Sequence, residues 1–113
     1  MDEERQDTAE VPNASNAQDG PDLDNVLFVG GKPFMNYVTG VVMQFTTKGV
    51  KEVIVKARGK FISRAVDIVE VCRKRFLRDL NLQVKEIKID SEEFVNREGR
   101  KVNVSTIEIV LTK

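Results

Sequence analysis

With 113 residues, of which 18 are Lys or Arg and 18 are Asp or Glu, the chain has room for one domain around one core and carries a formal net charge of zero. It contains no histidine and a single cysteine, Cys72, which excludes an internal disulfide and the usual zinc ligand sets. Because it has neither a basic segment followed by an apolar leader nor a run of about 18 apolar residues, we expect a cytoplasmic protein that does not span a membrane.

The neutral total hides a split in charge along the chain. Residues 1–24 hold eight Asp or Glu against Arg5, a net charge of −7, whereas residues 25–113 hold seventeen Lys or Arg against ten Asp or Glu, a net charge of +7. The acidic segment has little apolar surface to bury, so we expect a disordered tail over residues 1–24 and one folded domain over residues 25–113. A basic domain of this kind most often binds phosphate.

The first half of the domain predicts a strand, a helix and a second strand. Residues 26–29 form a short apolar run that two glycines close, as in a buried strand that ends in a turn. Pro33 suits the first turn of a helix, apolar residues recur at helical spacing over residues 34–45, and Gly49 supplies a stop. The β-branched run over residues 50–57 predicts the second strand.

The second half predicts one helix and a long hairpin. An apolar stripe at helical spacing predicts a helix over Ile62–Leu77. Two strands follow around the turn Asn96–Gly99, and in each strand the apolar residues change from one alternating face to the other. Such a change requires a bulge or a change in which face is covered, so we infer a hairpin whose base packs under the helices while its tip leaves the domain as an arm.

Two residues of the second helix bear on self-association and packing. Phe76 is either a core residue or an exposed anchor for self-association, and its spacing favours the core. Cys72 is most simply a small buried apolar residue. Because a domain of this size buries a limited share of its surface, we also expect the protein to form a dimer.

The sequence offers little for catalysis. There is no histidine to act as a general base, no Cys–His or Ser–His pair, and no glycine-rich nucleotide fingerprint. The adjacent carboxylates Glu92 and Glu93 would point to opposite faces of a strand. We therefore expect no enzymatic activity, cofactor, metal ion or small-molecule substrate.

Basic residues gather instead at turns and at the ends of elements. Lys32 lies between a strand and a helix, and four more surround the exit of the second strand and the first turn of the next helix: Lys56, Arg58, Lys60 and Arg64. They would project from one end of the domain, where helix N-termini also favour anions. The alternative is a solvated rim that only aids solubility, but so dense a cluster favours phosphate binding. Asn36 could cap the first helix or contact a phosphate, and Tyr37 is expected to pack on that helix.

A second basic group lies at the predicted hairpin tip, where Arg97, Arg100 and Lys101 flank Glu98 and Gly99. A narrow cationic ribbon can enter a DNA minor groove, whose negative potential favours arginine. The alternative, an edge strand that its charge protects from aggregation, is equally consistent with these residues. The cations between Arg73 and Arg78, by contrast, complement the dipole at the end of the second helix.

Four ordered segments of the domain resemble the Alba family of archaeal chromatin proteins. They are residues 31–38 (GKPFMNYV), 54–67 (IVKARGKFISRAVD), 73–77 (RKRFL) and 104–109 (VSTIEI), and the resemblance covers the whole domain but not the acidic tail. It implies an α/β (α+β two-layer) domain of the order βαβαββ, with two helices on one face of a four-stranded mixed sheet and a protruding β-hairpin arm. It also implies a homodimer, or a heterodimer with a paralogue, that binds double-stranded DNA, and commonly RNA, with little sequence preference.

The resemblance further assigns roles to particular residues. By motif, Lys32, Arg58, Lys60 and Arg64 would face the nucleic-acid backbone, and the hairpin tip would approach the minor groove. Phe76 would pack between neighbouring dimers on DNA, which reverses the placement that its spacing favours. Gly31 stands where family members often carry a further basic residue before the proline. An RNA-binding role in a ribonucleoprotein and an adaptor that binds an acidic protein are the two alternative functions.

Overall fold

The computed structural model describes residues 25–113, so the disorder expected of residues 1–24 lies outside the described part of the chain. The order of the main elements is βαβαββ, as expected: β2 (Val26–Phe28), α1 (Phe34–Thr46), β3 (Glu52–Arg58), α2 (Ile62–Val71), β4 (Gln83–Val95) and β5 (Lys101–Thr112). Three short helical turns, Gly59–Phe61, Cys72–Phe76 and Arg78–Leu80, flank α2.

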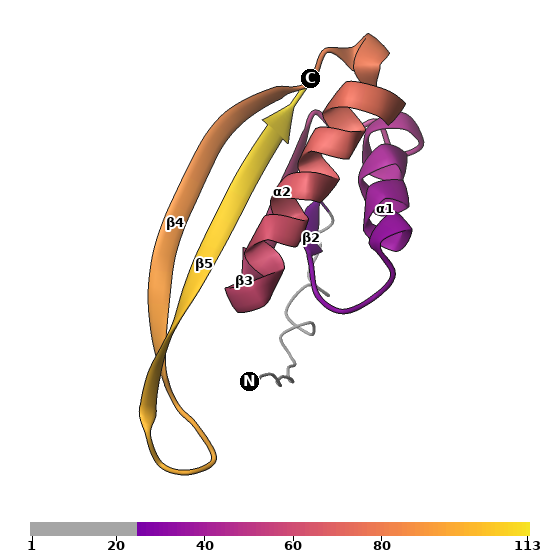
Figure 1. The fold of residues 1–113 in the computed structure, drawn as a ribbon. Helices are drawn as coiled ribbons and strands as arrows, with labels where there is room; N and C mark the ends of the chain where they lie inside the picture. Colours follow the sequence, from indigo (N-terminus) through magenta and orange to yellow (C-terminus); the bar gives the residue numbers. More distant parts are fainter. Residues whose placement is uncertain (1–24) are drawn as a thin grey trace.

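The four strands form one mixed sheet with both helices on the same face (Figure 1). The strand order is β2-β3-β5-β4, in which β2 pairs with β3 in parallel and the other two pairs are antiparallel. This arrangement confirms the predicted fold class. One face of the sheet packs on the helices. The opposite face carries no helix from residues 25–113 and is called the open face below.

The core lies between the helices and the sheet. Strand β3 alternates strictly, with Val53, Val55 and Ala57 buried and the residues between them more exposed. The helices contribute their own apolar stripes, in which Phe45 of α1 and Ile68 of α2 are among the largest fully buried side chains. This alternation places Lys56 and Arg58 on the open face.

The hairpin of β4 and β5 is longer than β3 and extends beyond the domain as an arm, which gives the molecule a longest extent of 49 Å (Figure 1). The predicted change of the apolar residues from one face to the other has a different origin in β4 and in β5. In β4 the register shifts between Val84 and Glu86, which is a bulge at Lys85. In β5 the register is continuous, and the covered face changes: Ile107 is buried under the helices, whereas Val102 faces the other way on the arm.

The second helix departs from the regular helix expected over residues 62–77. The α-helical part ends at Val71, and Cys72–Phe76 form a π-helical turn in which the N–H of Leu77 donates to the carbonyl of Cys72 at 2.8 Å. A π turn takes up an extra residue, so the position that faces the core moves on by one. Leu77 is accordingly 4% exposed and Phe76 53%, and the core placement of Phe76 from its spacing is wrong.

Cys72 is fully buried, as expected. Its thiol is 3.9 Å from the carbonyl oxygen of Val38, and burial raises the pKa of the thiol to about 12. The thiol therefore stays protonated at neutral pH and behaves as a small apolar side chain.

Candidate nucleic-acid interface

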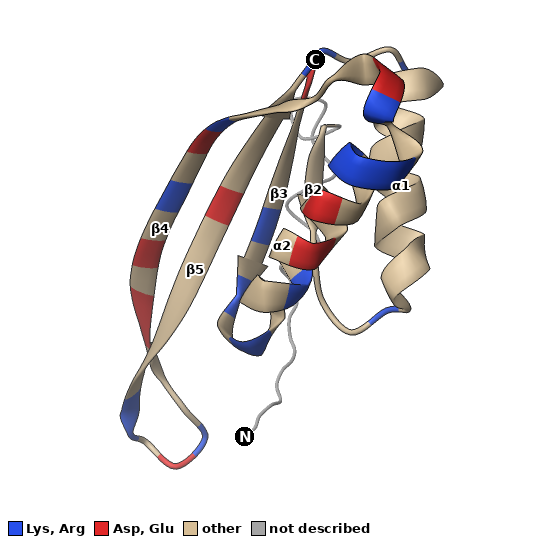
Figure 2. Ribbon diagram, turned by 45° about the horizontal axis from the view of Figure 1, so that its top comes forward, with Lys and Arg blue, Asp and Glu red and all other residues tan. Residues whose placement is uncertain are grey.

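The fold brings two basic segments to one end of the molecule. Strands β2 and β3 are parallel, so their carboxyl ends lie at the same edge, where the loop that carries Lys32 and the turn Gly59–Phe61 follow them. The arm continues beyond the same edge because β5 runs antiparallel to β3 and Arg58 pairs with Thr106. Figure 2 shows Lys and Arg on the loop, on the start of α2 and at the arm tip. We call this region the cationic end; its members are Lys32, Arg58, Lys60, Arg64, Arg97, Arg100 and Lys101.

Tyr37 and Arg64 hold the loop that carries Lys32. The hydroxyl oxygen of Tyr37 accepts hydrogen bonds from the backbone N–H groups of Gly30 at 2.9 Å and Lys32 at 3.1 Å. Arg64 donates from Nη1 to the Gly30 carbonyl at 2.7 Å, and its guanidinium carbon lies 5.7 Å from the centre of the Tyr37 ring. Arg64 is therefore partly engaged in fixing the loop, and Lys32 stays exposed at its apex.

The role of Tyr37 in this loop was missed by sequence reasoning, which placed the residue only as a packing side chain on the first helix. Tyr37 is indeed buried, at 6% exposed. Its position four residues after Pro33, on the helix that follows a glycine pair, is the signal that could have found the contact, because the first turn of a helix faces the loop that precedes it.

Arg58 ties the end of β3 to the arm. Its Nη2 lies 3.0 Å from Oε1 of Glu92, and its guanidinium carbon lies 5.3 Å from the centre of the Phe94 ring. Both partners belong to β4, so the side chain reaches across β5 on the open face. About half of the Arg58 side chain remains exposed, which leaves part of the guanidinium accessible at the root of the arm.

Lys56 is the one predicted member of the basic cluster that the fold sets apart. It lies two residues before the end of β3, on the open face, with Nζ 3.9 Å from Oε2 of Glu108 and 5.6 Å from the centre of the Phe28 ring. Lys60, in contrast, is exposed in the turn before α2, with its Nζ 5.4 Å from the Phe61 ring centre.

Asn36 is exposed in the first turn of α1 and does not cap the helix. Pro33 occupies the cap position, and no side-chain cap hydrogen bond is present there. The capping interpretation of Asn36 is therefore wrong. Because no side chain caps the start of α1, the positive end of its dipole can attract an anion.

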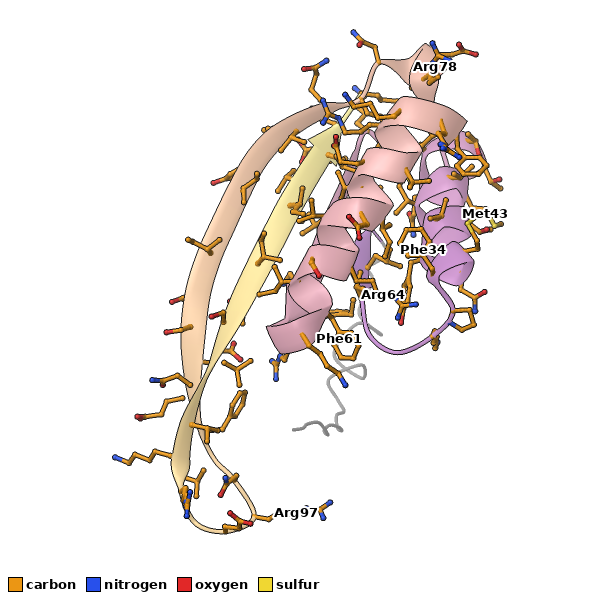
Figure 3. All side chains as sticks on the ribbon, in the orientation of Figure 1. Phe34, Met43, Phe61, Arg64, Arg78 and Arg97 are labelled. Carbon is orange, nitrogen blue, oxygen red and sulfur yellow. The ribbon has the colours of Figure 1, made fainter. Side chains whose placement is uncertain are left out.

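A compact turn presents the three cations of the arm tip. The Asn96 side-chain oxygen accepts from the N–H groups of Glu98 at 2.9 Å and Arg100 at 3.0 Å. Gly99 adopts a φ of +79°, which side chains rarely tolerate. Arg97, Arg100 and Lys101 are all exposed around this turn, and Figure 3 shows Arg97 at the tip of the arm. The sequence located the turn through its glycine but did not assign this role to Asn96.

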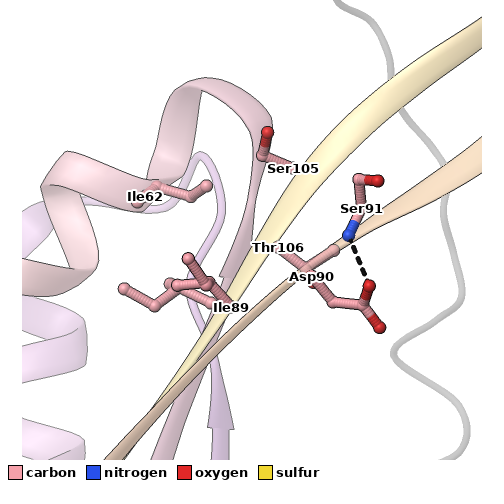
Figure 4. A pocket seen from close by; sticks show the side chains of 7 residues that line it. Ile62, Ile89, Asp90, Ser91, Ser105 and Thr106 are labelled. Atoms are coloured by element: carbon pink, nitrogen blue, oxygen red, sulfur yellow. Dashed lines mark hydrogen bonds between the residues drawn. The ribbon is translucent and has the colours of Figure 1, made fainter.

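An apolar groove lies where the arm leaves the helices (Figure 4). It has a volume of about 420 Å³ and is lined by Ile62 from α2 and by Ile89, Asp90, Ser91, Ser105, Thr106 and Ile107 from the hairpin. Ile89 is 77% exposed although it pairs with the buried Ile107, because β4 is the edge strand beyond the cover of the helices. Ile87 on the same strand and Val66 on α2 add to this exposed apolar surface.

Two absences hold within residues 25–113. No group of three or more His, Cys, Asp or Glu residues is placed to hold a metal ion. None of the helices there has the length and apolar composition needed to cross a membrane.

Comparison with known proteins identifies close relatives of the domain. The model of the Alba family matches residues 25–91. A DNA/RNA-binding protein Alba from Methanocella arvoryzae is 54% identical over 90 residues, which are 80% of this chain and 91% of the relative. A protein of the same name from Methanothrix thermoacetophila is 58% identical over 90 residues, which are 80% and 97% of the two chains.

Solved structures give the same result. Alba from Thermoplasma volcanium is 46% identical and aligns with a TM-score of 0.71 over 79% of this chain and 100% of that one. The Alba protein ALBA1 from Trypanosoma brucei is 32% identical, with a TM-score of 0.58 over 80% of this chain and 69% of that one.

Proposed function

This chain belongs to the Alba family, and from that premise we propose that it is a sequence-independent nucleic-acid-binding protein of the chromosome that coats, compacts or bridges double-stranded DNA without enzymatic activity. The observation that carries the proposal is the cationic end, where a braced loop, a helix start and the tip of an arm present Lys and Arg together. The relatives named DNA/RNA-binding protein Alba support nucleic acid as the ligand.

The cationic end suits phosphate contacts more than base readout. Lys32 and Lys60 lie next to the starts of α1 and α2, where the helix dipole adds positive potential. Contacts of this kind fix a protein on a duplex but carry no sequence information. The arm tip would follow the minor groove, whose negative potential favours arginine in any A·T-rich sequence.

We propose that the functional unit is a dimer, formed either by two copies or with a paralogue. The apolar surface of Ile62, Val66, Ile87 and Ile89 supports this because an exposed apolar patch beside an open groove marks an interaction site. Pairing through this surface would set two arms on one nucleic-acid molecule. Phe76, which is half exposed on the π turn, would then contact the next dimer along the duplex.

Binding to unrelated duplexes, together with charge reversal, tests the proposed function. The wild-type protein should bind two labelled duplexes of unrelated sequence with affinities within about threefold, because the backbone supplies most of the interaction. Lys32→Glu and Lys60→Glu should each weaken binding about tenfold or more. Lys88→Glu, an exposed reversal on the open face of β4, is the matched control and should have little effect. Wild-type affinity in both cationic-end variants would contradict the proposal.

RNA is the second candidate ligand, because the relatives carry both nucleic acids in their names. The test is competition between a duplex DNA and a structured RNA of equal length, followed by sequencing of the nucleic acid that co-purifies from cells. A clear preference for RNA in both measurements would favour a function in a ribonucleoprotein over a function on the chromosome.

A further inference from the structure

The end of the molecule opposite the arm tip is also rich in cations. Helices α1 and α2 both end there, and β3 and β4 both begin there, so the connections Thr47–Lys51 and Cys72–Leu82 lie at one edge. Figure 3 places Arg78 at this edge and Arg97 at the far tip of the arm. We call this edge the distal pole; its cations are Lys48, Lys51, Arg73, Lys74, Arg75 and Arg78.

A polar pocket lies at the distal pole. It has a volume of about 350 Å³ and is lined by Arg73, Lys74, Arg78, Asn81, Leu82 and Gln83. Its walls are held in place: Arg73 donates from Nη1 to Glu70 at 2.7 Å and from Nε to the carbonyl of Leu82 at 3.2 Å. Gln83 donates to the carbonyl of Asn81 at 3.3 Å, where Asn81 has a left-handed φ of 52°.

The charge at this pocket exceeds what the end of a helix requires. A helix C-terminus carries a partial charge of about −0.5, and Arg73 already lies within one turn of it. Lys74 and Arg78 are exposed, and neither forms an ion pair with another residue of the part that the structure describes. The nearby acids are Glu70, which pairs with Arg73, and Asp79. Two cations that converge on a polar pocket without acidic partners are suited to an oxyanion.

We infer that the distal pocket binds backbone phosphates of a second nucleic-acid segment, so that one protomer bridges two segments. The inference rests on the proposed function, since the first segment occupies the cationic end. The two poles lie at opposite ends of a molecule 49 Å long. This length is several times the Debye length of about 8 Å at physiological salt, so the two segments do not repel each other through the protein.

A capture assay tests the inference with the full chain. A short duplex is fixed to a surface, the protein is bound to it, and retention of a second, fluorescent duplex is measured. Lys74→Glu and Arg78→Glu should each reduce capture of the second duplex about tenfold and leave the affinity for a single duplex within about twofold of wild type. Lys88→Glu is again the matched reversal and should leave capture unchanged. In addition, the slope of log capture against log salt should be shallower by about 0.9 in Lys74→Gln than in the wild type, because one phosphate contact is lost.

Four results would overturn the inference. Capture by both glutamate variants at the wild-type level would show that the pocket is not used, and so would the absence of any capture by a wild-type protein that binds the first duplex. If Phe76→Ala lost capture while Lys74→Glu and Arg78→Glu retained it, bridging would be assigned to contacts between dimers. Binding of inorganic phosphate at about 1 mM by the wild type but not by Lys74→Glu, together with wild-type capture of the second duplex by Lys74→Glu, would assign the pocket to free phosphate. Failure of the wild type to bind even the first duplex would instead contradict the proposed function.

Discussion

The hydroxyl group of Tyr37 shapes the cationic end without being charged. Two backbone N–H groups, of Gly30 and Lys32, share it as their acceptor, and Arg64 closes the same loop from the other side. A loop held at three points presents its lysine in one position, which lowers the entropy lost when a phosphate is bound. Tyr37 is thus a positioning residue rather than a contact residue.

Replacement of Tyr37 by phenylalanine tests this role. The change removes the acceptor of two N–H groups and should lower the free energy of unfolding by about 1–3 kcal/mol. Duplex binding should weaken as well, because the Lys32 loop loses its support. Urea unfolding and fluorescence anisotropy measure the two effects, with Thr39→Ala at an exposed position of the same helix as control. A variant as stable as wild type would contradict the role.

The neighbours Phe76 and Leu77 should respond in different ways to replacement by alanine. Leu77→Ala should destabilise the protein by about 2–5 kcal/mol, because it removes a buried side chain. Phe76→Ala should cost much less, since the ring is half exposed, but should reduce the cooperativity of binding along DNA. Urea unfolding and binding isotherms on long duplexes measure the two effects. The reverse order of stabilities would contradict the π turn.

Two ion pairs join β3 to β4 across β5 on the open face of the sheet. Arg58 reaches Glu92 at 3.0 Å at the root of the arm. Lys85 at the bulge reaches Glu52 at 2.6 Å at the opposite end of the sheet, where β3 and β4 begin. The contact with Glu52 raises the pKa of Lys85. Exposed ion pairs contribute little to stability one by one. Of the two pairs, Arg58 with Glu92 is the one that lies where the arm leaves the domain, so it is the one suited to holding the arm's direction.

The apolar surface between α2 and β4 is the proposed contact between two protomers, and a charge placed on it should separate them. Ile89→Asp places a charge on the surface that we propose to join two protomers, and the residue is exposed, so the fold should persist. Light scattering after gel filtration should then give the mass of a monomer where wild type gives a dimer. Lys88→Glu, the adjacent residue on the opposite face, is the control. A dimeric Ile89→Asp protein would place the interface elsewhere.

Much of the element order could be predicted from the sequence, because the apolar residues follow two clean periods. The strict alternation of β3 and the stripe of α2 are local signals, and the phase change in β4 predicted an irregularity before its position was known. Phe76 could not be placed in this way, since a period of 3.6 residues fails within a π turn. Lys56 shares the open face with Arg58, but it lies two residues before the end of β3, where its Nζ is 3.9 Å from Glu108 and 5.6 Å from the centre of the Phe28 ring, and its closeness in sequence to Arg58 did not reveal these contacts.

Within residues 25–113, Lys and Arg occur at both ends of the molecule, and Asp and Glu occur among them (Figure 2). The basic residues of the cationic end are a binding site that the acidic residues 1–24, which lie outside the described part, could occupy. A flexible chain of 24 residues has an r.m.s. span of about 25–30 Å. The segment joins the domain at Asn25, whose carbonyl accepts from the N–H of Ile54 in β3. From Ile54 the strand runs four residues, or about 13 Å, to its end at Arg58, which is less than the span of the segment.

Deletion of residues 1–22 should therefore tighten duplex binding. We propose that the acidic segment competes with phosphate for the cationic end, so the gain in affinity should be largest at low salt, where screening is weakest. Affinities at 50 and 200 mM salt, with and without the segment, measure the effect. A scrambled segment of the same composition is the control and should act like the native one. If the proteins with and without the acidic segment bound the duplex equally well at both salt concentrations, competition between this segment and phosphate would be excluded.

The salt dependence of duplex binding measures how many phosphates the protein neutralises. If the cationic end and the arm neutralise about six phosphates, log affinity should fall against log salt with a slope near −5, and Arg97→Gln combined with Arg100→Gln should make the slope shallower by about 2. A wild-type slope near zero, or one that the arm substitutions leave unchanged, would contradict an account in which this surface grips the nucleic-acid backbone.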